Sequence, residues 1–79
     1  MRVHVRLFAA ARELAGEGHQ DLDLPEGATL GTLQALLEAR YQGIRDVVQC
    51  FAVNRQFATS ETPLHAGDEV ACIPPVGGG

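Results

Sequence analysis

The residues best suited to chemistry in this chain are its last seven. They run, in order, Ile73, Pro74, Pro75, Val76, Gly77, Gly78 and Gly79. The six residues from Pro74 onward can reach about 20 Å when extended, at roughly 3.3 Å per residue. Glycine has no Cβ, so the tip can enter a channel too narrow for any side chain, whereas the two prolines make a stiff root. The reactive group at the tip is the α-carboxylate of Gly79, and the sequence predicts that the chain presents it to other enzymes.

A glycine-rich end has a second interpretation. The terminal residues of most domains are poorly ordered, and many of them are glycine. An inert tail is therefore an alternative that the last residues alone leave open. The residues upstream have to decide between the two, because a presenting tail needs a folded domain to carry it.

Length and composition place this chain among small folded domains. Its 79 residues predict one domain with room for a sheet and one covering layer of helix, and little room for an enclosed active site. A net charge of −4 argues against nucleic acid as a partner and favours basic partner surfaces. With no apolar run of membrane-spanning length and no signal peptide after Met1, we expect no membrane association and a cytoplasmic location.

The cysteines and histidines predict neither a disulfide nor a metal centre. Cys50 and Cys72 both lie in apolar, strand-like runs, so we expect two reduced core residues. His4, His19 and His65 are scattered along the chain, without metal-ligand spacing. We therefore expect no bound metal.

The first third of the chain predicts two strands around a short helix. Apolar and polar residues alternate over residues 2–7, as in a strand with one buried face, and Phe8 then falls on the polar face. Residues 9–15 favour a short helix that carries Arg12 on a solvated face, ended by Gly16. Residues 19–24 predict the second strand.

The remainder predicts one long helix and further strands. Thr29 is a good N-cap for a helix with apolar residues at helical spacing, and we expect Gly43 to end it. Residues 44–48 suit a single helical turn. A third strand is predicted at 48–53, a turn at 54–56 with Phe57 after it, and a last strand at 69–73. That last strand is apolar enough for a central position, parallel to the first.

Together these elements predict an α+β fold. We expect a mixed sheet of four to five strands packed on one main helix, with a short extra helix after the first strand. The folded domain should span residues 1–73, and residues 74–79 should form a flexible tail.

Several stretches of the chain also match a known family in order and spacing. They are Leu7-Phe8-Ala9-Ala10-Ala11-Arg12-Glu13-Leu14-Ala15-Gly16, Leu24-Pro25-Glu26-Gly27-Ala28-Thr29, Ala52-Val53-Asn54, Thr62-Pro63-Leu64, Gly67-Asp68-Glu69-Val70 and Ile73-Pro74-Pro75-Val76 with the terminal glycines. Over essentially its whole length the chain thus resembles the MoaD/ThiS sulfur-carrier family of ubiquitin-like, β-grasp proteins. The helix after the first strand and the Pro74-Pro75 root resemble MoaD-type members, the small subunits of molybdopterin synthase. Gly77 departs from them, because a non-glycine residue is common there.

The resemblance implies a role as covalent sulfur donor. A MoeB-like adenylating enzyme would use ATP to activate the Gly79 carboxylate, and a sulfur-donor enzyme would convert it into a thiocarboxylate. A MoaE-like large subunit would then pass the sulfur to cyclic pyranopterin monophosphate in molybdenum cofactor biosynthesis. Gly77 and Gly78 would give the tail its reach. The chain itself would bind no cofactor and would catalyse nothing alone.

Other functions stay open at this point. The carrier could serve thiamine thiazole synthesis, tRNA thiolation or another sulfur-transfer pathway. It could also be a ubiquitin-like modifier joined to other proteins through Gly79, or an interaction module with an inert tail. All six basic residues are arginine, so a modifier of this sequence could not form lysine-linked chains on itself.

A docking surface is expected near the tail. If Val70 and Cys72 point to the helix, Ile73 points outward beside Phe8, and Phe57 could join them as one apolar patch. The matching positions of MoaD-like proteins resemble a contact with the large subunit. We therefore expect a partner-binding surface comprising Phe8, Arg12, Phe57, Ile73, Pro74, Pro75 and Val76.

Overall fold

The computed structural model describes residues 1–75 of the chain. It contains five strands and three helices. The elements placed from the sequence occur in the predicted order, and a short strand at Gln56–Ala58 is added to them. The elements are β1 (Arg2–Leu7), α1 (Ala9–Ala15), β2 (His19–Asp23), α2 (Leu30–Arg40), α3 (Ile44–Val47), β3 (Cys50–Val53), β4 (Gln56–Ala58) and β5 (Glu69–Ile73). The short helix after the first strand and the single turn before the third strand are both confirmed.

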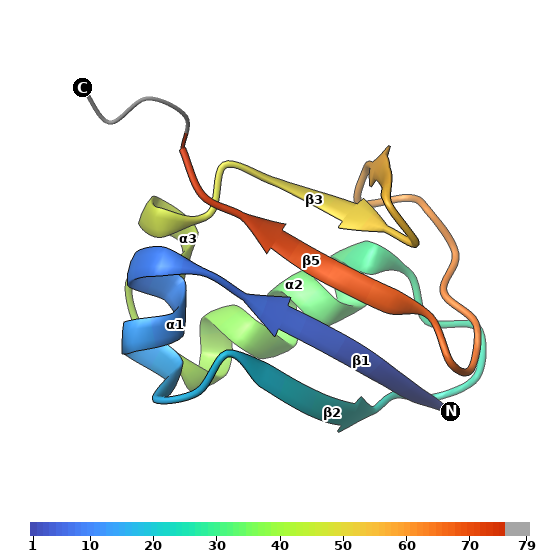
Figure 1. The fold of residues 1–79 in the computed structure, drawn as a ribbon. Helices are drawn as coiled ribbons and strands as arrows, with labels where there is room; N and C mark the ends of the chain where they lie inside the picture. The colour runs from blue at the N-terminus through green and yellow to red at the C-terminus, as the bar shows by residue number, and fades with distance from the viewer. Residues whose placement is uncertain (76–79) are drawn as a thin grey trace.

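The strands form one mixed sheet in the order β2-β1-β5-β3-β4 (Figure 1). The last strand therefore lies at the centre, between β1 and β3. It runs parallel to β1, as expected, and it is also paired antiparallel with β3. Helix α2 crosses one face of this sheet, which we call the inner face, and the opposite face is the outer face. The architecture is a β-grasp, so the predicted α+β fold is confirmed.

The core lies between the inner face and the helices. Its buried members come from every layer: Val3, Val5, Leu7, Ala11, Leu22, Leu24, Ala28, Leu30, Leu33, Leu37, Ile44, Leu64, Val70 and Cys72. The alternation along β1 is thus realised, because Val3, Val5 and Leu7 are at most 1% exposed. Burying side chains of this kind stabilises the fold by about 1.5–3 kcal/mol each, and this burial holds β1 and β5 at fixed positions.

Helix α2 begins as predicted and ends earlier than predicted. Thr29 caps it, accepting a hydrogen bond from the Thr32 backbone N–H, and the Thr32 side chain accepts one from the Thr29 backbone N–H. The expectation that Gly43 ends the helix is wrong. The chain leaves helical geometry at Tyr41, whose hydroxyl is hydrogen-bonded to Gln20 of β2, and Gly43 instead begins α3 with φ 90°.

Two strand boundaries also differ from the sequence-based prediction. The third strand begins at Cys50 rather than at residue 48, because α3 occupies the chain up to Val47. Gln56 belongs to β4 rather than to a turn. The β3–β4 turn has only two residues, Asn54 and Arg55, with φ values of 50° and 71°. Phe57 consequently lies within β4, which is an edge strand of the sheet.

Candidate functional site

The root of the tail is the carboxyl end of the central strand. The backbone N–H of Gln49 donates to the Ile73 carbonyl at 2.8 Å, one residue beyond the β3 ladder. Pro74 and Pro75 have no N–H and cannot extend the pairing. Pro74 is half-buried and Pro75 exposed. The chain therefore leaves the sheet at a strand held on both sides, at the end of the molecule where α1 and α3 lie (Figure 1).

The four residues beyond this root lie outside the described residues. They are Val76, Gly77, Gly78 and Gly79. The chemistry expected at the Gly79 carboxylate therefore stays a prediction, and the structure describes the surface from which the tail departs.

The register of the sheet determines which side chains share the outer face. Residues directly opposite each other on paired strands point to the same side. Val70 and Cys72 of β5 are in the core, so Ala71 and Ile73 point outward. Ala71 lies opposite both Arg6 of β1 and Ala52 of β3, and Ala52 lies opposite Phe57 of β4. Arg6 in turn lies opposite His19 of β2, so one outer row crosses all five strands from His19 to Phe57.

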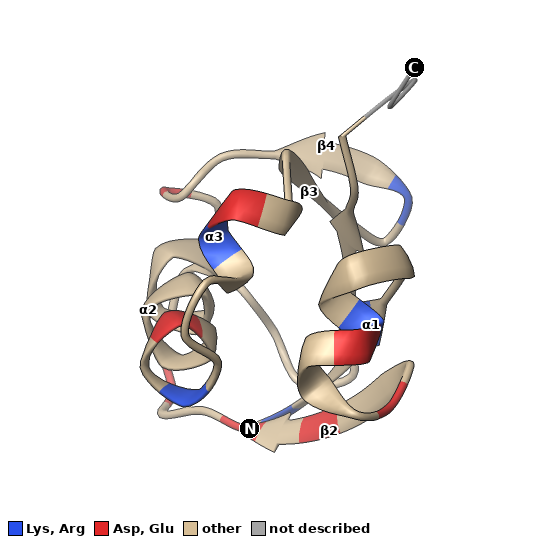
Figure 2. Cartoon of the chain, turned by 90° about the vertical axis from the view of Figure 1, so that its left-hand side faces the viewer, with Lys and Arg blue, Asp and Glu red and all other residues tan. Residues whose placement is uncertain are grey.

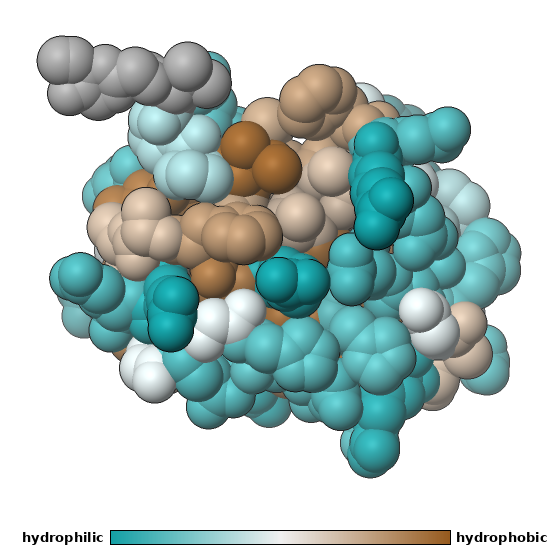
Figure 3. Space-filling view, viewed as in Figure 1, coloured by the Kyte–Doolittle hydropathy of each residue, from teal (hydrophilic) through white to brown (hydrophobic). Residues whose placement is uncertain are grey.

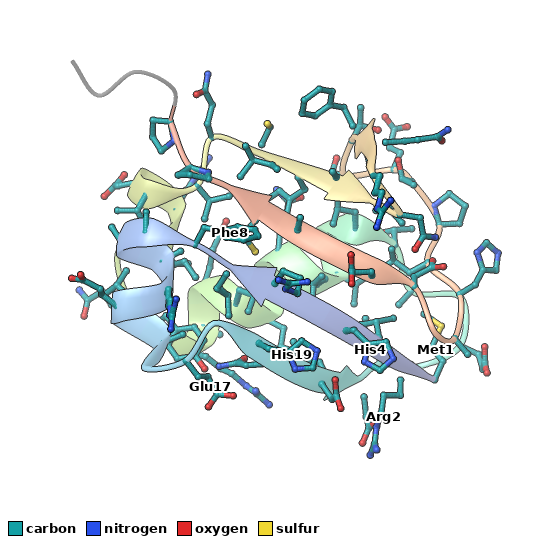
Figure 4. The ribbon with its side chains drawn as sticks, viewed as in Figure 1. Met1, Arg2, His4, Phe8, Glu17 and His19 are labelled. Carbon is teal, nitrogen blue, oxygen red and sulfur yellow. The ribbon has the colours of Figure 1, made fainter. Side chains whose placement is uncertain are left out.

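A second row runs beside the first, at the tail root. Cys50 lies opposite Ile73. Phe8 and Ile73 each follow a residue of the last β1–β5 pair, Leu7 and Cys72, so they are neighbours across the two strands. Figure 4 shows Phe8 on the outer face near the end of β5. The structure therefore places Phe8, Ile73 and Phe57 on one face, as their alternation predicts.

The apolar side chains of these two rows form what we call the outer apolar patch. It comprises Phe8, Cys50, Ala52, Phe57, Ala71 and Ile73. Ala52 is only 7% exposed but lies outside the core cluster, which agrees with its place on the outer face. Phe8 and Phe57 lie at opposite ends of the patch, with side chains 39% and 80% exposed, and smaller side chains lie between them. Figure 3 shows apolar side chains gathered over the upper part of this face, with polar ones below.

Two arginines stand beside Phe8 at the edge of the patch. The guanidinium carbon of Arg6 lies 5.8 Å from the centre of the Phe8 ring, within range of a cation–π interaction. Arg12 of α1 lines the same shallow hollow as Phe8, together with Glu69. A Cβ on Gly18 would lie 3.3 Å from Arg12 Nε, so the glycine leaves room for that side chain. The structure thus brings Arg12 to the patch, and adds Arg6, which the sequence did not single out.

The prediction that both cysteines belong to the core is wrong for Cys50. Both thiols are free, but only Cys72 is in the core, where burial raises its pKa to about 12. Cys50 is half-buried on the outer face, because it pairs with Ile73 rather than with an inward residue. The two side chains leave neighbouring strands on opposite sides of the sheet. Alternation could have signalled this, but the third strand is apolar on both faces.

The other part of the outer face, over β1 and β2, is polar. Arg2 Nε donates to Asp23 at 3.0 Å, and Arg6 lies 3.8 Å from Glu69. The pKa of the Asp23 carboxyl is held below its usual value, chiefly by the hydrogen bond from Arg2. The outer face therefore divides into a charged half and the outer apolar patch, and the tail root borders the latter.

The end of the molecule around the tail root carries charges of both signs. Figure 2 shows one basic and one acidic residue on each of the two short helices there. They are Arg12 and Glu13 on α1, and Arg45 and Asp46 on α3. The described part of this end is thus not a field of one sign, so net charge there does not favour a partner surface of either sign.

Comparison with known proteins places this geometry in a family. Residues 5–79 match the model of the ThiS family. The chain belongs to the ThiS family. A curated relative, the molybdopterin synthase sulfur carrier subunit of Chlamydomonas reinhardtii, is 36% identical over 83 residues, covering 100% of both chains. The family resemblance drawn from the sequence motifs is therefore confirmed.

Solved structures of similar proteins share the fold over the whole chain. SAMP1 from Haloferax volcanii, a small archaeal modifier protein, is 27% identical with a TM-score of 0.85, covering 100% of both chains. A chain from the complex of subunits 1 and 2 of the molybdopterin-converting factor from Helicobacter pylori is 28% identical with a TM-score of 0.71, again covering 100% of both. The ThiS-family fold thus occurs both in a protein modifier and in a two-subunit complex.

No helix in the described part of the chain is both long and apolar enough to cross a membrane.

Proposed function

We propose that this chain is the sulfur-carrier subunit of a molybdopterin synthase and that its Gly79 carboxylate carries the sulfur. The observation behind this proposal is the full-length similarity, at 36% identity, to a protein of that name. The sequence adds what the role requires, a diproline root followed by a terminal run of three glycines.

The chemistry would take place on partner enzymes. A MoeB-like enzyme would bind ATP. The Gly79 carboxylate would attack the α-phosphorus of the ATP to give an acyl-adenylate and pyrophosphate. The persulfide of a donor enzyme would then displace AMP to give an acyl disulfide. A second thiol on a partner enzyme would cleave that bond, which releases the thiocarboxylate and leaves a disulfide on the enzyme. The described residues contribute positioning, because a tail that starts from a central strand places its end within a limited volume, and small misplacements cost large factors in rate.

The outer apolar patch would bind the synthase large subunit. It borders the tail root, so a partner bound there receives the tail at a fixed distance. Its exposed phenylalanines and the smaller side chains between them suit an apolar segment of the partner. The Helicobacter pylori chain of the same fold is described as part of a complex of two converting-factor subunits. This similarity supports a MoaE-like partner, with Arg12 at the edge of the contact.

A protein-modifier function is the second candidate. The similarity to SAMP1 over the full length of both chains favours it. Both functions begin with the same activated carboxylate and differ in whether sulfur or a lysine amine accepts the acyl group. Because this chain has no lysine, activation of the chain alone would give no lysine-linked ladder, and any adduct would involve a lysine of another protein.

The experiment is a comparison of acceptors. The chain is converted to its thiocarboxylate and incubated either with the cognate synthase large subunit and cyclic pyranopterin monophosphate, or with the cognate thiazole synthase and its substrates. We expect molybdopterin in the first reaction, no thiazole in the second, and no product from the untreated carboxylate form. Thiazole without molybdopterin would contradict the proposal.

Recovery of the chain from a lysate of the cells that naturally produce it tests the modifier alternative. We expect the chain to be recovered there free or with the large subunit. Isopeptide adducts through Gly79 as its main form would favour the modifier.

A further inference from the structure

Three side chains on the charged half of the outer face converge on one point. They are His4 of β1 and His19 and Asp21 of β2. His4 Nδ1 lies 2.7 Å from Asp21 Oδ1, and His19 Nε2 lies 3.5 Å from the same oxygen. The two imidazole rings are stacked, with centroids 6.0 Å apart and planes 13° from parallel. Figure 4 shows both rings on the same side of the sheet, from neighbouring strands.

Strand pairing, rather than loop conformation, creates this cluster. His4 lies directly opposite Asp21, and Arg6 lies opposite His19. The two histidines are therefore diagonal neighbours, while His19 and Asp21 are two residues apart on one strand and point the same way. Inward residues on both strands, such as Val5 and Leu22, are anchored in the core. The three donors are thus held on rigid elements, which is the arrangement that a precise ligand site needs.

We propose that His4, His19 and Asp21 bind a transition-metal dication of the Zn²⁺ class on the outer face of the sheet. Two imidazoles and one carboxylate are a ligand set typical of zinc, with bonds of about 2.0–2.2 Å. Tetrahedral bonds of that length place neighbouring donor atoms about 3.3 Å apart. The distances from Asp21 Oδ1 to His4 Nδ1 and to His19 Nε2, 2.7 and 3.5 Å, lie on either side of this value, and all three donor atoms lie within 4.8 Å of one another.

The surrounding charges leave the carboxylate available to a cation. The nearest arginines, Arg2 and Arg6, are each paired with another acid, Asp23 and Glu69. The present partner of Asp21 in the cluster is His4, whose Nδ1 is hydrogen-bonded to Asp21 Oδ1 at 2.7 Å. An entering ion would replace this hydrogen bond with direct coordination. His4 Nδ1 and Asp21 Oδ1 would separate by about 0.6 Å to reach tetrahedral spacing, and the two stacked rings would turn so that a ring nitrogen of each faces the ion.

Three protein ligands leave a tetrahedral ion one open position. The donors are partly exposed, with side-chain exposures between 40% and 56%, so water or a donor from another molecule can fill it. The site lies over β1 and β2, and of its three donor residues only His19 borders the hollow that Phe8 and Arg12 line. The proposal rests on the placement of the donor residues and not on the function proposed above.

The test is calorimetric titration of the full-length chain with Zn²⁺ alone. We expect one equivalent to bind, and the affinity to fall about tenfold or more in His4→Ala and in His19→Ala. His65→Ala is the matched control: it also removes an exposed histidine next to an aspartate, Asp68, but in a loop outside the cluster. We expect it to bind as the unchanged chain does. Circular dichroism verifies that each variant is folded.

A second measurement reports the geometry of the site. Co²⁺ in a four-coordinate site of this ligand set gives intense visible absorption, and we expect that absorption in the unchanged chain and in His65→Ala. The proposal is overturned if His4→Ala or His19→Ala binds Zn²⁺ as tightly as the unchanged chain. It is also overturned if His65→Ala lowers the Zn²⁺ affinity as much as the cluster variants do. A third contradicting outcome is Zn²⁺ binding that disappears in Cys50→Ser but persists in the folded His19→Ala variant.

Discussion

Cys50 and Cys72 show how the position of one residue on a strand changes its chemistry. The two strands that carry them are paired, yet Cys72 is in the core and Cys50 is on the outer face. Burial raises the Cys72 pKa to about 12. Its thiol therefore stays protonated and unreactive at neutral pH, since the thiolate is the nucleophile.

We expect an alkylating reagent such as iodoacetamide to modify the native chain at one cysteine. Peptide mass mapping should find the label on Cys50, and label on Cys72 only after unfolding. Cys50→Ser is the control, and it should leave the native chain unlabelled. Rapid native labelling of Cys72 would contradict its placement in the core.

The Cys72 thiol also predicts an alkaline limit to stability. Its pKa is 9.0 for the ordinary group and about 12 in the folded chain, so above pH 9 the unfolded state loses the proton first. The stabilisation is complete below about pH 9 and is lost as the pH rises toward 12. Denaturant unfolding of the chain and of Cys72→Ala between pH 8 and 11 measures this. We expect the unchanged chain to lose stability with pH more steeply than the variant, and equal slopes would show that the thiol has no part in it.

At the scale of elements, the β3–β4 hairpin positions Phe57. Asn54 and Arg55 both have positive φ, as in a type I′ turn. Asn54 suits this conformation and also links the hairpin to β5, donating to Asp68 and accepting from the Glu69 backbone N–H. Arg55 makes the same turn with a β-carbon that disfavours positive φ.

Arg55→Gly should therefore stabilise the chain by about 1 kcal/mol, because glycine adopts positive φ without steric cost. Gln56→Gly is the matched control in the adjoining strand β4, where glycine should destabilise by roughly 0.5–1 kcal/mol. Chemical denaturation of both variants measures the free energies of unfolding. A loss of stability in Arg55→Gly as large as in Gln56→Gly would contradict the turn.

Most of the element order could be predicted from the sequence, and most of the site's detail could not. Alternation identifies the inward residues of β1, and Thr29 marks the start of α2. Alternation does not identify the inward residues of the third strand, because that strand is apolar on both faces. Phe51 and Val53 pack on the core, while Ala52 is buried on the other side. The His4–His19 cluster depends on cross-strand register, and sequence spacing alone does not contain it.

For the whole molecule, the parallel pairing of β1 with β5 joins the start of the chain to the strand from which the tail departs. Phe8 and Ile73 are 65 positions apart in the sequence, yet neighbours at the tail root. Phe57 lies three strand spacings from β1, roughly 14 Å. The outer apolar patch thus spans the central strands of the sheet.

Phe8→Asp should weaken binding to the synthase large subunit by about 2 kcal/mol or more, because it replaces an apolar anchor beside the tail root with a charge. Phe57→Asp tests the far edge of the patch. Leu14→Asp is the control, since Leu14 is also a large exposed apolar residue, 44% exposed, but lies on α1 outside the patch. Calorimetric titration compares the three. Unchanged affinity for both phenylalanine variants would exclude this surface, whereas Leu37→Asp, in the core, should instead destabilise the fold.

The measurement closest to the central claim is the intact mass of the chain after incubation with its cognate adenylating enzyme, ATP and a persulfide sulfur donor. We predict that the mass rises by the difference between one sulfur and one oxygen atom, and that fragmentation places the change on Gly79. A chain lacking Gly79 should fold equally well and show no change, because its carboxylate no longer reaches the position where activation occurs. A chain that gains sulfur without Gly79, or an intact chain that gains it on Cys50, would contradict the account.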